Sequence, residues 1–164
     1  MLDILPVDQR EGRGSCGAAC LKTVLAYHGV ATTEAKLAKM LGNTPTNGTT
    51  GEALVRVAKK FGLQSFMKDD SELSDIKKNL DKKIPVIVAW FSGTDGHYSV
   101  VVGMDRENIY LQDPELGHLR AMHHVWFKRV WFDFWGPYMK KANDLILRRM
   151  IILLPPPPPQ NNAG

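Results

Sequence analysis

GRGSCGAACLKTVLAYHG, residues 12–29, contains both cysteines of this 164-residue chain. A glycine-rich loop gives way at Cys16 to apolar residues at helical spacing, with Ser15 as a suitable N-cap and Gly29 as a suitable stop. The pattern predicts a helix over residues 16–28. Cys16 would then lie at the helix N-terminus, where free backbone N–H groups and the helix dipole favour a thiolate. Such a thiolate would be a nucleophile, and a small buried cysteine is the alternative interpretation.

Cys20 follows one helical turn later and falls within the apolar stripe, so we expect it to lie in the core. A disulfide with Cys16 is disfavoured because both Cβ atoms tilt toward the helix N-terminus instead of converging. A zinc site built on the two cysteines would need a second paired ligand motif, and the sequence offers none. We therefore expect no metal and no other cofactor, and the low cysteine content fits a reducing cytoplasm.

The composition is that of an ordinary globular domain, with 44% hydrophobic residues, 23% charged residues and a net charge of +4. Basic residues are scattered among acidic ones instead of clustering with aromatic residues, which argues against a nucleic-acid-binding face. No apolar run approaches the roughly 18 residues of a membrane span. The N-terminus also lacks the basic start and long apolar run of a signal peptide. These features predict one cytoplasmic domain.

Helical patterns fill the first half of the chain and strand patterns the second. Further helices are predicted over residues 33–41, 51–61 and 71–81. Thr49 and Ser71 are the expected caps of the last two helices. Strands are predicted over residues 63–67, 85–91, 97–104, 109–112, 118–122 and 145–154, and residues 124–144 are expected to be irregular. Helices followed by an antiparallel sheet make an α+β fold. Residues 1–154 would form one domain and the proline-rich residues 155–164 a flexible tail.

A thiolate nucleophile needs a histidine that is held in place by a third group. His97 opens an apolar strand directly after a glycine-containing turn, and Asp113 ends the next strand. An antiparallel hairpin would bring these two strand ends together. With a two-residue loop residue 97 pairs with 116 and Asp113 points away, whereas a three-residue loop pairs 97 with 115 and puts both side chains on one face. A slip of one residue decides between these registers, and the sequence leaves both open.

The segments CGAACL (16–21), GHYSVV (96–101) and QDP (112–114), together with Gln9, resemble the bacteriocin-processing, double-glycine leader peptidase family. These are papain-like cysteine peptidases, and the resemblance covers roughly residues 5 to 150. It implies an N-terminal helical lobe whose nucleophile helix packs on an antiparallel β-sheet. It also implies a hydrolase that removes a leader peptide after a Gly-Gly-type site, through an acyl-enzyme.

The same resemblance implies a role for each matching residue. Cys16 would be the nucleophile, His97 its general base and later acid, and Asp113 the group that orients the imidazole. Gln9 would donate an N–H to the oxyanion hole. The family places this glutamine six residues before the cysteine and here the offset is seven, so either the loop carries an extra residue or Gln9 is not the donor. Neighbouring residues expected to contact the substrate are Gly14, Ser15, Gly17, Gly96 and Tyr98.

Many members of this family are N-terminal domains of peptide-exporting ABC transporters. The expected partners are therefore a peptide or leader-peptide substrate and a transporter or other domain outside this chain, at the inner face of the membrane. Bulky side chains could narrow the cleft around a Gly-Gly pair, or fill the core instead; the candidates are Trp90, Trp126, Trp131 and Trp135. Two alternatives remain open: a catalytically weak peptide-binding module of the same fold, and an acyl transferase or transpeptidase that uses the same Cys–His pair.

Overall fold

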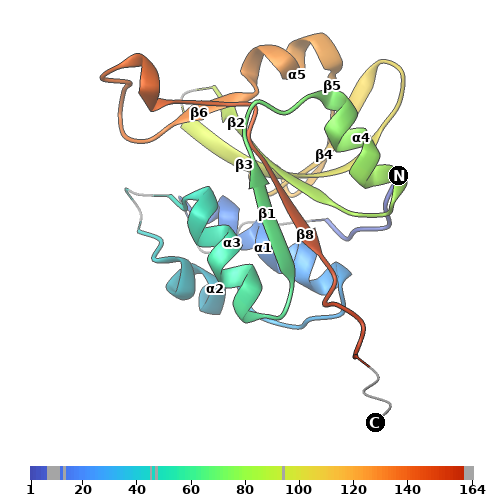
Figure 1. Cartoon of the computed structure of the whole chain (residues 1–164). Helices are drawn as coiled ribbons and strands as arrows, with labels where there is room; N and C mark the ends of the chain where they lie inside the picture. The colour runs from blue at the N-terminus through green and yellow to red at the C-terminus, as the bar shows by residue number, and fades with distance from the viewer. Residues whose placement is uncertain (7–11, 13, 45, 47, 94, 161–164) are drawn as a thin grey trace.

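The structure is a computed structural model, and it describes residues 1–6, 12, 14–44, 46, 48–93 and 95–160. Three helices precede all the strands of the sheet and form a lobe on one of its faces (Figure 1): α1 (Cys16–Tyr27), α2 (Glu34–Leu41) and α3 (Gly51–Lys60). Two more helices cover the other face: α4 (Leu73–Asp81) and α5 (His124–Val130). The layers are therefore helix, sheet and helix.

The six-stranded sheet has the order β1-β8-β2-β3-β4-β5, and every neighbouring pair is antiparallel. Its strands are β1 (Gln64–Lys68), β2 (Val86–Ser92), β3 (Asp95–Met104), β4 (Asn108–Asp113), β5 (His118–His123) and β8 (Met150–Leu154). A separate two-stranded sheet pairs β6 (Phe132–Phe134) with β7 (Leu145–Leu147) and extends as an arm beyond the main sheet (Figure 1). A short 3₁₀ turn, η1 (Ala142–Asp144), precedes β7.

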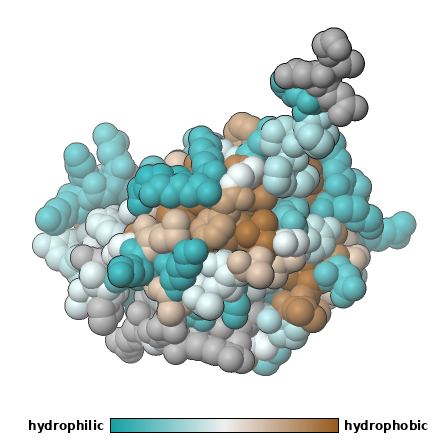
Figure 2. Space-filling view, turned by 90° about the horizontal axis from the view of Figure 1, so that it is seen from below, coloured by the Kyte–Doolittle hydropathy of each residue, from teal (hydrophilic) through white to brown (hydrophobic). Residues whose placement is uncertain are grey.

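Each face of the sheet buries its own core. On β2, Ile87 and Ala89 pack with the helical lobe, whereas Val86, Val88 and Trp90 pack on the face covered by α4 and α5. A strand that is buried on both faces reads as a continuous apolar run, which is why the β2 segment lacks alternation. Seen from below, the protein shows a hydrophobic area in the middle of its surface with hydrophilic residues around it (Figure 2). Within the described residues, no helix is long and apolar enough to cross a membrane.

The pairing of β3 with β4 resolves the register that the sequence left open. Beside the turn Met104 pairs with Ile109, a register that would place residue 97 opposite 116. A bulge between Val101 and Gly103 then shifts the pairing by one residue, so that Val100 lies opposite Gln112 and residue 97 opposite 115. The extra residue in β3, and not the loop length, therefore brings His97 and Asp113 onto one face.

Several sequence predictions of helices, strands and helix caps were wrong. Residues 124–130 form α5 within the segment expected to be irregular. The expected closing strand over 145–154 is divided into β7 and β8, because Arg148 adopts a left-handed φ of 50° between them. The cap of α3 is Thr50, whose side chain accepts a hydrogen bond from Ala53 N, and not Thr49. Ser71 does not cap α4, because its hydroxyl donates to the Lys68 carbonyl. The division into residues 1–154 and a tail at 155–164 remains a prediction.

Candidate active site

Cys16 begins α1, as the sequence predicted, and is 9% exposed. Ser15 occupies the N-cap position but its hydroxyl does not cap the helix; it donates to Glu34 Oε1 at 2.8 Å. The preceding loop is held by Asn43 Nδ2, which donates to the Gly14 carbonyl at 3.1 Å. Because Ser15 turns away from the first turn of α1, no side chain of the described residues caps the N–H groups of that turn, and they can stabilise a thiolate or an oxyanion.

Cys20 has no exposed surface and lies in the core of the helical lobe. Burial is the main reason that the pKa of its thiol is well above the usual range, with the negative charges of Cys16 and Asp113 adding to the effect. A thiol that stays neutral is a poor nucleophile. Cys20 is therefore a core residue, as expected from the sequence, and both cysteines are free.

His97 links the cysteine to an aspartate. Its Nε2 lies 2.7 Å from Asp113 Oδ1, and the Cys16 side chain is near enough to raise the pKa of the same ring. Because Nε2 is engaged with Asp113, Nδ1 is the ring nitrogen left to face the sulfur. Burial lowers the pKa of His97, but the hydrogen bonds to Asp113 and Cys16 and their charges outweigh burial and raise it to about 9. The ring therefore stays protonated at neutral pH.

Asp113 ends β4 and its residue has no exposed surface. Burial favours its neutral form, yet the hydrogen bond to His97 and the positive charges of His97 and Arg120 lower the pKa below the usual value. Oδ1 also accepts a hydrogen bond from Glu115 N at 3.0 Å. The carboxylate is thereby held ionised against the imidazole.

Arg120 was not singled out by the sequence analysis. Its Nε lies 2.9 Å from Asp113 Oδ2. Neither atom makes a well-directed hydrogen bond, so the contact is an ion pair. The pairing of β4 with β5 puts Arg120 opposite Leu111. Arg120 is therefore diagonal to Asp113, two residues further along β4, and on the same face of the sheet. Predicting this contact from the sequence would have required knowledge of the register between β4 and β5.

The expected substrate-contacting residues lie around Cys16 and His97 with different exposure. Gly96 is exposed and Gly14 is half-buried, whereas Ser15, Gly17 and Tyr98 are buried. The Ser15 hydroxyl is engaged with Glu34, so a substrate contact through it would have to use the backbone. Contact with substrate remains a prediction for all five. Gln9 lies outside the described residues, and its role remains a prediction as well.

A carboxylate that the sequence analysis missed packs against Gly96. A Cβ atom on Gly96 would collide with the carboxyl group of Asp133 in β6, lying 2.6 Å from its Cγ. Burial raises the pKa of Asp133 to about 6, partly offset by a hydrogen bond from Phe134 N. Phe132 and Phe134 on either side of it stack on Phe91 of β2. The aromatic contacts therefore fix this acid beside the residue that precedes His97.

Gly96→Ala is expected to lower kcat/KM by about tenfold or more, because Asp133 or the strand carrying His97 must move to make room. Removing the obstructing carboxylate in Gly96→Ala/Asp133→Gly should restore part of the loss. Gly48→Ala is the matched control, since a Cβ there meets no atom within 4 Å. Steady-state kinetics on a Gly-Gly-containing peptide would measure all three, and equal activity of Gly96→Ala and wild type would contradict the prediction.

His97, Asp113 and Glu115 form a group whose potential ligand atoms lie within 4.8 Å of one another. The first two are already paired with each other, and Asp113 is also paired with Arg120. A cation beside the carboxylate opposes a second positive charge at the same place. The geometry therefore fits an oriented imidazole better than a metal ligand set.

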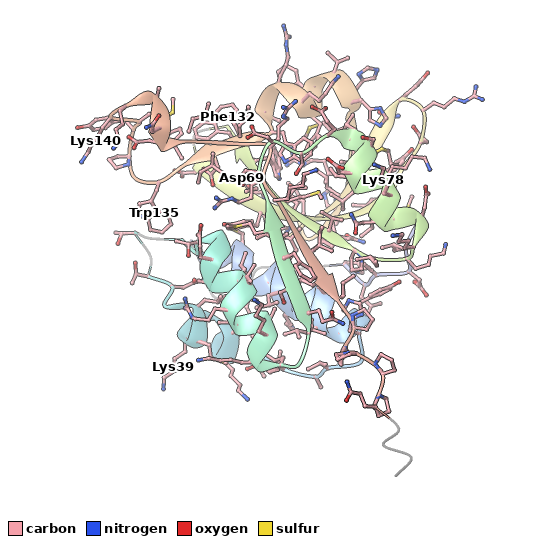
Figure 3. The ribbon with its side chains drawn as sticks, in the orientation of Figure 1. Lys39, Asp69, Lys78, Phe132, Trp135 and Lys140 are labelled. Atoms are coloured by element: carbon pink, nitrogen blue, oxygen red, sulfur yellow. The ribbon has the colours of Figure 1, made fainter. Side chains whose placement is uncertain are left out.

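The four tryptophans divide between core and surface. Trp90 and Trp131 are buried in the core under α4 and α5, whereas Trp126 and Trp135 are each more than half exposed. Trp135 lies below the β6–β7 arm, on the side that faces the helical lobe, and Phe132 lies nearer to the main sheet (Figure 3). Trp135 is therefore a tryptophan that is both exposed and located on the side of the arm that faces the helical lobe.

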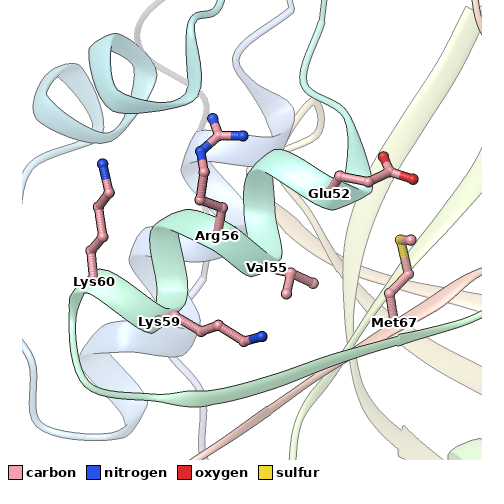
Figure 4. Close-up of a pocket in the computed structure, with 6 residues that line it drawn as sticks. All are labelled: Glu52, Val55, Arg56, Lys59, Lys60 and Met67. Atoms are coloured by element: carbon pink, nitrogen blue, oxygen red, sulfur yellow. The ribbon is translucent and has the colours of Figure 1, made fainter.

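A groove of about 440 Å³ lies between α3 and β1 (Figure 4). Its walls are mainly apolar and its edge is basic; the lining residues are Glu52, Val55, Arg56, Lys59, Lys60 and Met67. Glu52 is in the first turn of α3, next to Gly51, against which Met67 packs. The segment leading into α3 also contacts the active-site helix, because Thr49 packs on Gly17. The Glu52 end of the groove is therefore the end nearer to the segment that packs on α1, and the groove runs from there along α3.

Residues 5–134 match the Peptidase C39 family. An uncharacterized protein of Methanothermobacter thermautotrophicus is 39% identical over 116 residues, which are 71% of this chain and 75% of that protein. The transport/processing ATP-binding protein ComA of Streptococcus pneumoniae is 34% identical over 128 residues, 76% of this chain but only 17% of ComA.

Solved structures of two peptidase domains have the same fold. The peptidase domain of Streptococcus ComA, a bi-functional ABC transporter, superposes with a TM-score of 0.73 at 23% identity, covering 94% of this chain and 99% of that domain. A double glycine motif protease from an AMS/PCAT transporter, solved with a leader peptide, superposes with a TM-score of 0.71 at 21% identity, covering 93% and 92%. The α+β fold is therefore papain-like, as expected, and the chain belongs to the Peptidase C39 family of cysteine peptidases.

Proposed function

We propose that this chain removes a leader peptide from a precursor by hydrolysing the bond after a Gly-Gly pair, with Cys16, His97 and Asp113 as its catalytic triad. The observation that carries the proposal is the buried His97, which is hydrogen-bonded to Asp113 and whose pKa is raised by both Asp113 and Cys16. Its pKa of about 9 favours a thiolate–imidazolium pair at neutral pH. The family membership and the leader-peptide complex of a similarly folded protease support the choice of substrate.

In this mechanism the Cys16 thiolate attacks the carbonyl carbon of the scissile bond. The oxyanion that forms is stabilised by backbone N–H groups at the start of α1 and, in the family pattern, by Gln9. The C–N bond then breaks as His97 gives its Nδ1 proton to the leaving amine, which leaves a thioester on Cys16. Water, deprotonated by His97, attacks the thioester and releases the carboxylate product and the free thiolate. Asp113 holds the ring in the orientation that both proton transfers require.

The groove between α3 and β1 suits the part of the leader that precedes the Gly-Gly pair. Its apolar walls include Val55 and Met67, and three cations, Arg56, Lys59 and Lys60, line it. An amphipathic segment with acidic residues beside apolar ones would match both features. In the proposed arrangement the cleaved bond lies at Cys16 and the upstream leader follows α3. The cleavage takes place in the cytoplasm, where the chain acts beside an ABC transporter.

The proposal is tested by incubating the chain with synthetic precursors that carry Gly-Gly and following the products by mass spectrometry. A cut directly after Gly-Gly is expected, and a precursor with both glycines changed to leucine should stay intact. Adding amines at millimolar concentration separates hydrolysis from acyl transfer, because a transferase would join the amine to the leader carboxyl. Binding without any cut over hours would overturn the proposal and favour the peptide-binding alternative.

Neutralising the groove with Lys59→Gln/Lys60→Gln is expected to raise KM about fivefold and leave kcat unchanged. Contacts far from the scissile bond contribute equally to the bound substrate and to the transition state, so their loss affects KM. Lys128→Gln/Arg129→Gln is the matched control, because it removes two exposed cations from α5 on the opposite face of the sheet. A KM that changes equally in both variants would place the leader elsewhere.

A further inference from the structure

Four neighbouring strands each place one side chain in a row on the face of the sheet that carries His97. Trp90 of β2 pairs directly with His97 of β3. Asp113 follows on β4, and Arg120 lies on β5, diagonal to it. The resemblance that identified the nucleophile, the base and the aspartate involves neither Trp90 nor Arg120.

Contacts link these four side chains in a closed ring. The Arg120 Nε lies 2.9 Å from Asp113 Oδ2, and the guanidinium carbon lies 5.3 Å from the centre of the Trp90 ring. Trp90 in turn meets His97 edge to face, with ring centres 5.5 Å apart. The indole Nε1 donates to Ser99 Oγ at 3.0 Å, which fixes the tilt of the ring. Arg120 thus touches the aspartate directly and reaches the histidine through Trp90.

Arg120 meets the part of Asp113 that His97 does not use. Oδ1 accepts from Glu115 N and faces His97, whereas Oδ2 has no exposed surface and faces Arg120. A buried carboxylate oxygen without a counter-charge is costly, so removing the guanidinium would favour rotation or protonation of Asp113. The guanidinium also lies over the Trp90 ring in a cation–π contact that a lysine ammonium cannot reproduce in the same form.

We propose that Arg120 is a positioning residue for the catalytic pair: it holds Oδ2 of Asp113 so that Oδ1 stays aimed at His97, and its charge sets the pH at which His97 loses its proton. The titratable or charged groups around His97 come from α1, β4 and its following turn, β5 and β6; they are Cys16, Asp113, Glu115, Arg120 and Asp133. Arg120 is the permanent cation of this set. With it, the charges of the thiolate, imidazolium, carboxylate and guanidinium cancel.

This inference rests on the proposed function for the identity of the catalytic pair, and its test does not depend on finding the substrate. The rate at which iodoacetamide alkylates Cys16, measured from pH 4 to 11, reports the thiolate and the protonation of His97 in the wild type and in Arg120→Met. Without the cation Asp113 rotates or takes up a proton more readily, so the imidazolium loses its counter-charge and the upper inflection should move to lower pH by about one unit. If a cleavable peptide is in hand, kcat should fall by about tenfold with little change in KM.

Arg120→Lys keeps the charge and loses the planar fork, so it should return the inflection toward the wild-type position while kcat recovers only in part. Arg106→Met is the control, because Arg106 is exposed in the turn between β3 and β4. A change in thermal unfolding without any shift of the inflection would show a merely structural role and overturn the proposal. Failure of the proposed function would look different: wild-type alkylation would show the His97 step, but no Gly-Gly peptide would be cut.

Discussion

Replacing Cys16 with alanine is expected to lower the cleavage rate of a Gly-Gly precursor by at least about 10³-fold while leaving the fold intact. The nucleophile has no substitute in the described structure, because Cys20 is fully buried and its thiol pKa is raised. Removing one member of a triad commonly costs nearly as much as removing all of it, so about 10³-fold is a lower bound. Single-turnover cleavage followed by mass spectrometry measures the loss.

Cys20→Ala is the matched control, since it removes the same atom from the same helix one turn away. It should keep nearly full activity and lose only the stability of one small buried side chain. In the wild type, iodoacetamide should label Cys16 and leave Cys20 unmodified. If Cys20→Ala loses activity as fully as Cys16→Ala, or if Cys16 resists labelling in the folded protein, the assignment of the nucleophile is wrong.

Asp113→Asn is expected to move the alkaline limb of kcat/KM downward from about pH 9 by about one to two units, so that activity at pH 9 falls by about 5- to 50-fold. Burial by itself lowers the pKa of His97, and the hydrogen bond to Asp113 is the largest of the contributions that raise it to about 9, with the charge of Asp113 adding to them. An asparagine keeps an acceptor but carries no charge. His97 then loses its proton at a lower pH, and the leaving amine has no proton donor.

The direction of the His97 pKa shift can also be checked by measuring how the stability of the protein depends on pH. A histidine whose folded pKa of about 9 exceeds the usual 6.5 adds stability that is fully present below pH 6.5 and is lost as the pH rises through 9. Denaturant titrations should therefore show stability falling between pH 6.5 and 9 in the wild type and changing less in Asp113→Asn. Asp105→Asn, in the exposed turn after β3, serves as the control. An alkaline limb that stays at pH 9 in Asp113→Asn would contradict the role given to Asp113.

Much of the site followed from local patterns. The N-terminal position of Cys16 on α1 came from a helical stripe that starts after a glycine-rich loop. The buried position of Cys20 came from the same stripe. His97 and Asp113 were placed at neighbouring strand ends by the periods of two apolar runs. Such patterns involve residues a few positions apart, so the sequence contains everything needed to read them.

Other parts of the site depend on contacts between distant segments. Arg120 reaches Asp113 through the register of β4 and β5, and Asp133 reaches Gly96 through the β6–β7 arm. Ser15 looked like an ordinary cap, yet its hydroxyl is taken by Glu34, nineteen residues later. Tertiary hydrogen bonds and ion pairs can outweigh a local capping preference of about 1 kcal/mol.

By itself, the sequence determined the α+β order of elements, the helix that begins at Cys16 and the two strand ends that carry His97 and Asp113. Only the tertiary structure decided whether the last two side chains meet. Successive side chains of a strand point to opposite faces, so one additional residue in β3, the bulge between Val101 and Gly103, turns an unfavourable register into the one that pairs them. Gly103, a glycine inside a strand pattern, is a local sign of a bulge, but only the pairing with β4 shows that the register shifts there, and the active-site geometry depends on that shift.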